Sequence, residues 1–406
     1  MLKRKITLGV ATATLLSSSL FGIDMEQVQI FGYGNIYYQN YDYLPNYQSK
    51  PESRAKVDLE RFVLAPQFLV NDTIKIVSEI EFEHGGTGVT TEYDTLDEFG
   101  EFETEIEKGG EVVVEEMYVD FSIMKEFNLK VGHSIVPIGL NSQRHLPSLY
   151  LSTMRNISET TILPNTWHES GITAYGKFGE YINYQAMVMT GLNSEFFNSH
   201  HWIREGNQKR FESVNADNLA FALRVDLGDV VGSHIGASYY IGNTNQNRNK
   251  QQLKSDGTVT IAEVHGVYDE HNIRLRGLAL LGTLSDSDTI SQANRNLPNA
   301  LEAKRTPVAH KAVAYLLEAG YNISPLFGYD KEITPFVKYD YVNSMYKTEG
   351  VIQADDRYET TTLTMGLAYF VTPQIVVKAD YATTSYGPKS KIEDLHFATL
   401  AMGFQF

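Results

Sequence analysis

The 406-residue chain contains no cysteine, which excludes disulfide scaffolds, Cys-ligated zinc, iron–sulfur clusters and cysteine nucleophiles. Positive charge is also scarce, because 34 Lys and Arg stand against 50 Asp and Glu, giving a net charge of −16. Binding to nucleic acid requires clustered basic residues that neutralise phosphates, so no nucleic-acid partner is expected. After residue 22 no run of about 18 apolar residues occurs, and membrane-spanning helices are therefore not expected.

Common catalytic and cofactor motifs are missing as well. The sequence has no G-x-S-x-G, no H-E-x-x-H, no P-loop and no dinucleotide fingerprint. His200 and His201 are adjacent and would point to opposite faces of a strand, which does not favour a shared metal ion. The sequence therefore predicts a protein that is not an enzyme and that has no cofactor and no metal.

The amino terminus has the pattern of an export signal. A basic segment, Lys3–Lys5, precedes an apolar stretch at 6–20. We expect a secretory signal peptide at 1–22 and a single exported domain at 23–406. The alternative, a buried helix at the start of a cytoplasmic domain, fits the basic flank less well.

The most informative feature of the sequence is alternation with a period of two residues. In 219–227, Leu, Phe and Val occupy every second position, while Arg224 and Asp226 lie among the intervening residues. The same pattern recurs in 74–82, 273–281, 333–341 and 375–381. These segments reach the length that a tilted strand needs to cross a bilayer.

Sixteen such segments can be placed along the chain. Most of the odd-numbered connections between them are long and polar, and the even-numbered ones are short. This rhythm predicts an all-β fold, a transmembrane antiparallel β-barrel of about 16 strands with tight periplasmic turns and long external loops. The expected strands are 27–42, 53–69, 73–84, 111–122, 128–139, 169–178, 181–192, 217–228, 232–243, 258–268, 271–284, 310–322, 331–345, 358–371, 373–387 and 392–406.

The last predicted strand ends on Phe406. A terminal aromatic residue that closes an amphipathic strand resembles the signature read by the barrel assembly machinery. The resemblance implies the outer membrane of a Gram-negative bacterium, contact with lipid and lipopolysaccharide, and recognition of the C-terminal strand by that machinery.

Two long loops differ in character. The loop at 85–110 is strongly acidic and is expected to be a solvated surface loop. The loop at 141–168, the third external loop, has helical spacing and carries Arg144, Arg155 and Glu159. We expect this third loop to fold inward and narrow the pore; the alternative is a loop that lies over the outer rim.

Two segments resemble a known family. Val131–Leu140 (VGHSIVPIGL) is similar to the G-Q-x-x-x-P-x-G-L segment of the phosphate-selective porin O/P family, with His133 where Gln is usual, and Arg54–Pro66 is similar to its Arg-rich second strand. The resemblance implies a homotrimeric channel for small hydrophilic solutes and ions. The predicted inner face mixes both signs of charge instead of forming a dense Arg ladder, which does not favour phosphate selectivity.

The predicted function is passive diffusion through a water-filled porin. Basic residues near the narrowest point favour weak anion selectivity, because charges on the rim are screened by salt. The alternatives are an outer-membrane barrel enzyme and a surface β-rich adhesin. The expected pore-lining and constriction residues are Arg144, Arg155, Glu159, Arg224, Asp226, Arg274, Arg276, Lys338 and Asp340.

Overall fold

The structure is a computed structural model that describes residues 27–46, 48–86, 89–92, 105–108, 110–208, 213–297 and 305–406. The expected signal peptide at 1–22 lies outside these residues and stays a prediction. Most of the acidic part of the loop at 85–110 also lies outside them.

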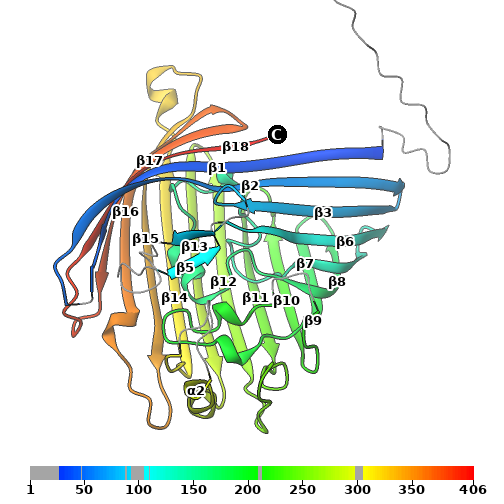
Figure 1. Cartoon of the computed structure of the whole chain (residues 1–406). Helices are drawn as coiled ribbons and strands as arrows, with labels where there is room; N and C mark the ends of the chain where they lie inside the picture. The colour runs from blue at the N-terminus through cyan, green and yellow to red at the C-terminus, as the bar shows by residue number, and fades with distance from the viewer. Residues whose placement is uncertain are drawn as a thin grey trace, which may run out of the picture.

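Sixteen antiparallel strands form a closed barrel (Figure 1). Each strand pairs with its neighbours along the chain, apart from β3, which pairs with β6 across an inserted two-stranded sheet, β4 (Val89–Glu92) with β5 (Glu105–Lys108). The barrel strands are β1 (Val28–Tyr43), β2 (Glu52–Asn71), β3 (Ile74–Glu83), β6 (Val112–Met124), β7 (Phe127–Ile135), β8 (His168–Phe178), β9 (Ile182–Thr190), β10 (Leu219–Gly228), β11 (His234–Gly242), β12 (Val259–Glu270), β13 (Ile273–Leu284), β14 (Lys311–Tyr321), β15 (Ile333–Lys347), β16 (Glu359–Thr372), β17 (Ile375–Tyr386) and β18 (Leu395–Gln405).

The helices are short and lie in the connections. The α-helices are α1 (Ile157–Ile162) and α2 (Ser287–Arg295), and the 3-10 turns are η2 (Pro147–Leu149), η3 (Ser194–Phe196), η4 (Arg204–Gly206), η5 (Ser324–Phe327) and η6 (Asp356–Tyr358). Among the described residues, none of these helices is both long and apolar enough to cross a membrane.

Pairing between the first and last strands closes the ring. Tyr33 lies opposite Gln405, and the backbone N–H of Phe406 donates to the carbonyl of Gly32 at 2.8 Å. Because strand edges carry unpaired N–H and C=O groups, closure is what allows a sheet to present its outer face to lipid. The predicted transmembrane antiparallel barrel of sixteen strands is confirmed as a fold.

The two rims of the barrel differ, as the connection lengths predict. Most even connections are short, the shortest being 72–73, 125–126, 271–272 and 373–374, with 322–332 as the exception. The odd connections include the long ones, 84–111, 136–167, 191–218 and 285–310. The turn between β12 and β13 is His271–Asn272, with both φ angles positive at 54° and 64°. A two-residue hairpin turn with both φ angles positive matches the twist of the flanking strands. His271 and Asn272 are residue types that adopt positive φ more readily than Glu270, which agrees with a turn two residues beyond the predicted one at 269–270.

The alternation predicted for the strands is present in the side-chain exposure. On β10 the side chain of Leu223 is 37% exposed on the outer face, while the next residue, Arg224, is 3% exposed. Leu275 on β13 and Val337 on β15 are exposed in the same way. The outer surface therefore presents the apolar belt that a barrel in lipid requires.

One predicted strand is too long. The segment 128–139 was expected to be strand throughout, but β7 ends at Ile135. Pro137 has no backbone N–H to donate, and Gly139 has φ of 75°, so neither can continue the strand ladder. The third loop therefore spans 136–167, and His168 begins β8.

A hydrophobic core lies between the barrel wall and the long loops. It joins Trp167 of the third loop and Trp202 of the next long loop to wall residues such as Tyr240, Leu278 and Leu316. Some wall positions that the alternation predicts to face inward are apolar because they pack against these loops.

A pair of substitutions on β10 tests where the outward-facing residues of this strand lie between the middle and the edge of the membrane. Leu223 lies mid-strand and Leu227 lies beside the 229–233 turn, and both are exposed. We expect Leu223→Arg to lower the free energy of unfolding in lipid vesicles by about 2–4 kcal/mol, and Leu227→Arg by only about 0–1 kcal/mol, because the cost of an outward Arg falls toward the interface. Urea titration measures the free energy of unfolding of both variants. Equal losses would show that Leu223 and Leu227 do not lie at the assigned depths in the membrane.

Candidate functional site

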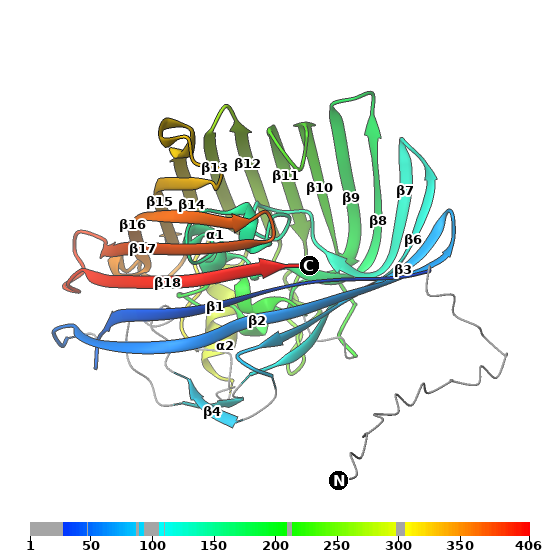
Figure 2. The same ribbon diagram turned by 90° about the horizontal axis from the view of Figure 1, so that it is seen from above.

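The third loop, 136–167, is bonded to strands on several sides of the barrel. It contains η2 and α1, and α1 packs against β14 and β15 (Figure 2). Residues of β2, β10, β15, β17 and β18 all make side-chain hydrogen bonds to this loop. A loop lying only over an outer rim would not make bonds distributed in this way around the wall.

Two charged side chains of β17 hold the middle of the loop. The ammonium group of Lys378 donates to the carbonyls of Tyr150 at 2.7 Å and Ser152 at 3.0 Å, and it lies 3.7 Å from the centre of the Tyr150 ring. The carboxylate of Asp380 accepts bonds from the backbone N–H and the hydroxyl of Thr153 at 2.6 and 2.9 Å. Hydrogen bonds to charged groups are the stronger class, so these contacts fix the loop backbone against the wall.

Further contacts hold the two ends of the loop. Asp340 of β15 accepts from the backbone N–H and the hydroxyl of Ser158 at the start of α1. Arg144 donates to the carbonyls of Val230 and Val231 at 3.0 and 2.9 Å, in the short turn between β10 and β11. The loop thus extends from the rim of long loops to the rim of short turns.

Glu159 stabilises the fold of the loop itself. Its carboxylate accepts bonds from the backbone N–H groups of Leu140 and Asn141 and from the side-chain amide of Asn156. Burial raises the pKa of Glu159. A Cβ at residue 139 would lie 2.1 Å from the Glu159 carboxylate, so only glycine fits there.

His145 is a neutral group in this environment. Burial is the main cause that lowers its pKa to about 3. Its backbone carbonyl accepts a bond from Arg61 of β2 at 2.8 Å. The loop therefore contacts β2, on the opposite side of the β1–β18 closure from β17.

Eight of the nine predicted constriction residues are buried, with exposures of 8% or less; Arg274 is the partly exposed one. Within the predicted set, each cation on the wall lies near a carboxylate, and so does Arg155 of the third loop. The ion pairs are Arg224–Asp226 at 2.7 Å, Arg276–Glu318 at 3.5 Å, Lys338–Asp340 at 3.4 Å, Arg274–Asp269 at 3.2 Å and Arg155–Glu60 at 3.7 Å. The charges of these side chains are therefore largely paired within the protein. Some of the predicted residues, such as Asp340 and Arg224, also hold the third loop against the wall.

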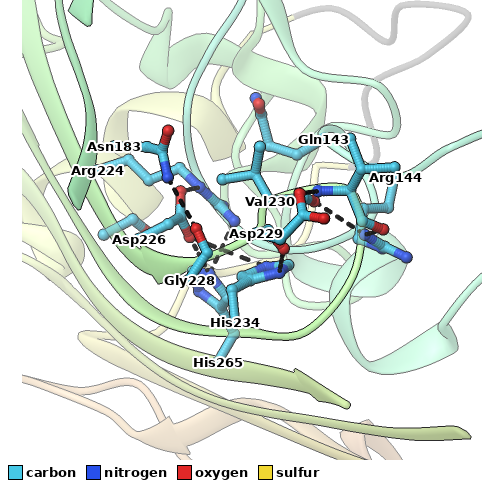
Figure 3. Close-up of polar contacts among 12 residues, drawn as sticks. Gln143, Arg144, Asn183, Arg224, Asp226, Gly228, Asp229, Val230, His234 and His265 are labelled. Atoms are coloured by element: carbon cyan, nitrogen blue, oxygen red, sulfur yellow. Dashed lines mark hydrogen bonds and ion pairs between the residues drawn. The ribbon is translucent and has the colours of Figure 1, made fainter. Parts of the chain in front are cut away.

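A second cluster was not predicted from the sequence. Asp226, His234 and His265 lie on the adjacent strands β10, β11 and β12 beside the third loop (Figure 3). The side-chain donor atoms of these three buried residues lie within 4.8 Å of one another. Each residue sits at an inward position of its own strand, but only the strand register shows that the three meet.

Comparison with known proteins supports the fold and leaves the family open. No protein-family model matches the chain. An uncharacterized protein of Aquifex aeolicus is 27% identical over 381 residues, covering 93% of this chain and 80% of its own length.

Solved structures of similar fold are outer-membrane barrels. The outer membrane channel DcaP of Acinetobacter baumannii matches with a TM-score of 0.57 at 12% identity, covering 93% of this chain and 97% of its own. OmpF of Salmonella typhi, in complex with daunomycin, matches with a TM-score of 0.55 at 14% identity and the same coverage. At these identities the likeness establishes a shared barrel architecture.

The loop anchors can be tested by proteolysis. Replacing Lys378 by Met removes two charge-assisted bonds, each worth about 1.5–3 kcal/mol, so opening of the loop should increase about tenfold or more. We expect trypsin to cleave the detergent-solubilised variant after Arg144 and Arg155 at a correspondingly higher rate, as measured by mass spectrometry. Lys75→Met is the control, because Lys75 pairs with Asp120 on the neighbouring strand. Equal cleavage of both variants would contradict the anchoring role.

Proposed function

We propose that the chain is an outer-membrane porin that passes small hydrophilic solutes and ions. The observation that carries the proposal is a closed sixteen-stranded barrel whose third loop is bonded to β2, β10, β15, β17 and β18. A segment held on both sides of a barrel lies across its lumen, so this loop is the proposed constriction.

Charged groups on the inner wall support a hydrated lumen. Arg276 and Glu318 are both buried, and apart from their mutual contact neither side chain has a hydrogen-bond partner among the described residues. Buried charged groups need hydrogen bonds, and water is the available partner where the protein supplies none. Water between the third loop and β13–β14 is the medium through which a solute would pass.

The proposed charge selectivity is weak. The anion preference expected from Arg155, Arg274 and Arg276 is reduced in this proposal, because each guanidinium has a carboxylate within 4.0 Å. Arg274 is the one with a side chain 23% exposed, and it is the cation that we propose to act on passing anions. Phosphate selectivity is not part of the proposal.

Location and assembly are proposed on the same basis. The apolar outer belt fits an outer membrane, with lipid and lipopolysaccharide around it and the last strand as the part read by the assembly machinery. A homotrimer is the proposed oligomer. An enzyme on this fold stays an alternative, since a barrel can carry either function.

Conductance in planar lipid bilayers tests the channel directly. The purified, heat-modifiable barrel should give discrete conductance steps, grouped in threes if it is a trimer. A folded barrel that gives no steps, while a variant lacking 141–166 does, would mean that the third loop is a plug and that the protein is not an open porin. Absence of steps from both would exclude a channel.

Selectivity can be tested at Arg274. In a KCl gradient we expect the parent to have a reversal potential that indicates weak anion preference, and Arg274→Ala to shift it toward cations because a partly exposed positive charge is lost from the wall. Arg274→Lys keeps the charge and should stay close to the parent. Clear cation preference in the parent, or the same shift in both variants, would refute the assignment.

A further inference from the structure

The strand register brings three potential metal ligands together near the short-turn rim. Asp226 of β10 lies opposite Gly236 of β11, and Gly236 lies opposite His265 of β12, so the three form one row across the sheet. His234 lies two residues from Gly236 on the same face of β11 and begins the strand after the 229–233 turn. Carboxylate and imidazole are donor groups that zinc and related transition metals use.

Gly236 keeps the space between these side chains open. The outer two positions of the row are two strand spacings apart, yet the Oδ1 atom of Asp226 and the Nε2 atom of His265 are 2.7 Å apart. A Cβ at residue 236 would lie 2.3 Å from that oxygen and 2.5 Å from that nitrogen. The two side chains can meet only because the middle residue of the row is glycine.

Hydrogen bonds orient both imidazole rings toward the same point. The Nδ1 atom of His265 is 2.8 Å from the Oε1 atom of Glu263, and the Nδ1 atom of His234 is 3.1 Å from the carbonyl oxygen of Asp229. Because an oxygen acceptor holds Nδ1 of each ring, Nε2 is the nitrogen that is left to bind a metal ion. Carboxylate and carbonyl acceptors behind a histidine are the usual outer shell of a zinc ligand.

The Nε2 atom of His234 has no hydrogen-bond partner among the described residues. It is buried, with the residue only 4% exposed, and it makes no hydrogen bond within the described part of the chain. It lies 3.9 Å from the Oδ1 atom of Asp226, beyond hydrogen-bond distance (Figure 3). A buried, oriented nitrogen without a partner is costly unless a ligand completes it.

The contacts of His265 leave a similar imbalance. Its Nε2 atom is 2.7 Å from the carboxylate of Asp226 and also 2.7 Å from Nη2 of Arg224. If Nε2 carries a proton, two donors face each other, the N–H of His265 and the N–H of Arg224. If Nε2 carries a lone pair, that lone pair faces the lone pairs of the Asp226 oxygen. No single protonation state satisfies both contacts, whereas a cation between Asp226 and His265 would satisfy the carboxylate and the lone pair together.

We propose that Asp226, His234 and His265 form a binding site for a divalent transition-metal ion of the zinc class on the inner wall of the barrel. Tetrahedral zinc with ligand bonds of about 2.0–2.1 Å places its donor atoms about 3.3 Å apart. The two donor separations of 2.7 and 3.9 Å from Asp226 lie on either side of that value. The third separation, between the ligand atoms of His234 and His265, is within 4.8 Å, so the side chains would draw together around the ion, with water as the fourth ligand.

Arg224 competes with the metal. Its guanidinium places a positive charge at the cluster, with Nε 2.7 Å from the Oδ2 atom of Asp226 and Nη2 2.7 Å from Nε2 of His265. Metal binding displaces Nη2, while Nη1 keeps its 2.6 Å bond to the carbonyl of Gly139 in the third loop. The affinity is therefore set by a balance between a divalent ion and an arginine, and the site is adjacent to the proposed constriction.

Zinc titration of the full-length barrel in detergent tests the site. After treatment with a chelator, competition between the protein and a fluorescent zinc indicator at neutral pH should show one Zn²⁺ per chain with micromolar or tighter affinity. His234→Gln and His265→Gln should each weaken binding about 100-fold or more, and Glu263→Gln about 10–100-fold, because it only orients His265. Co²⁺ in place of Zn²⁺ should give the visible absorption of a low-coordinate histidine site in the parent and lose it in His234→Gln.

The control variant is His310→Gln. His310 also bonds a backbone carbonyl through Nδ1, that of Leu284, but it lies outside the cluster. It should bind zinc like the parent, and heat-modifiable migration confirms that each variant is folded. A folded parent without saturable zinc binding, an unchanged His234→Gln variant, or equal loss in His310→Gln would each overturn the proposal.

Arg224→Met provides a test in the opposite direction. Removing the competing positive charge should tighten zinc binding about tenfold or more, because a nearby cation repels a divalent ion strongly in a buried site. Gly236→Ala keeps every ligand but fills the space between them, so it should abolish binding. If Arg224→Met binds zinc no more tightly than the parent, the competition does not occur and the assigned position of the ion is wrong.

Discussion

The structure depends on the pairing of every strand edge. A sheet that presents Leu223, Leu275 and Val337 to lipid cannot leave backbone N–H and C=O groups unpaired, because no water is present there to bond them. The β1–β18 pairing meets this requirement by closing the ring. Closure then creates an interior, and the inward side chains must be paired with one another, with a loop or with water.

The third loop meets much of that requirement. Buried Lys378 and Asp340 would be costly without partners, and loop carbonyls, N–H groups and hydroxyls supply them. The same bonds fix the loop to several strands of the wall, so one set of contacts both compensates buried charge and holds the segment that we propose as the constriction. A wall lined with free charges would leave the loop mobile; here the charges near the loop are largely used in holding it.

In the cluster on β10–β12, the same side chains form a structural ion pair and the proposed binding site. Arg224 joins the carboxylate of Asp226, the ring of His265 and the carbonyl of Gly139, and so links the wall to the third loop. Glycine at 236 lets the flanking side chains converge, and the 229–233 turn places His234 at the edge of the same cluster. A ligand at this position would affect the third loop through Arg224, which bonds the carbonyl of Gly139.

The strands, their number and the two rims were predictable from the sequence, because a period of two residues and the alternation of loop lengths are local properties that a barrel requires. The sequence also identified the third loop and the charged positions of the inner wall. It placed the end of β7 four residues too late, since Pro137 and Gly139 follow the alternation but cannot pair. Which charges meet could not be predicted, because it depends on contacts between strands. Asp226, His234 and His265 are separated along the chain, and the register across three strands brings them together, with a glycine between two of the side chains. Burial of Arg224 was likewise invisible in the sequence, because its guanidinium bonds the carbonyl of Gly139 in a loop from a different part of the chain.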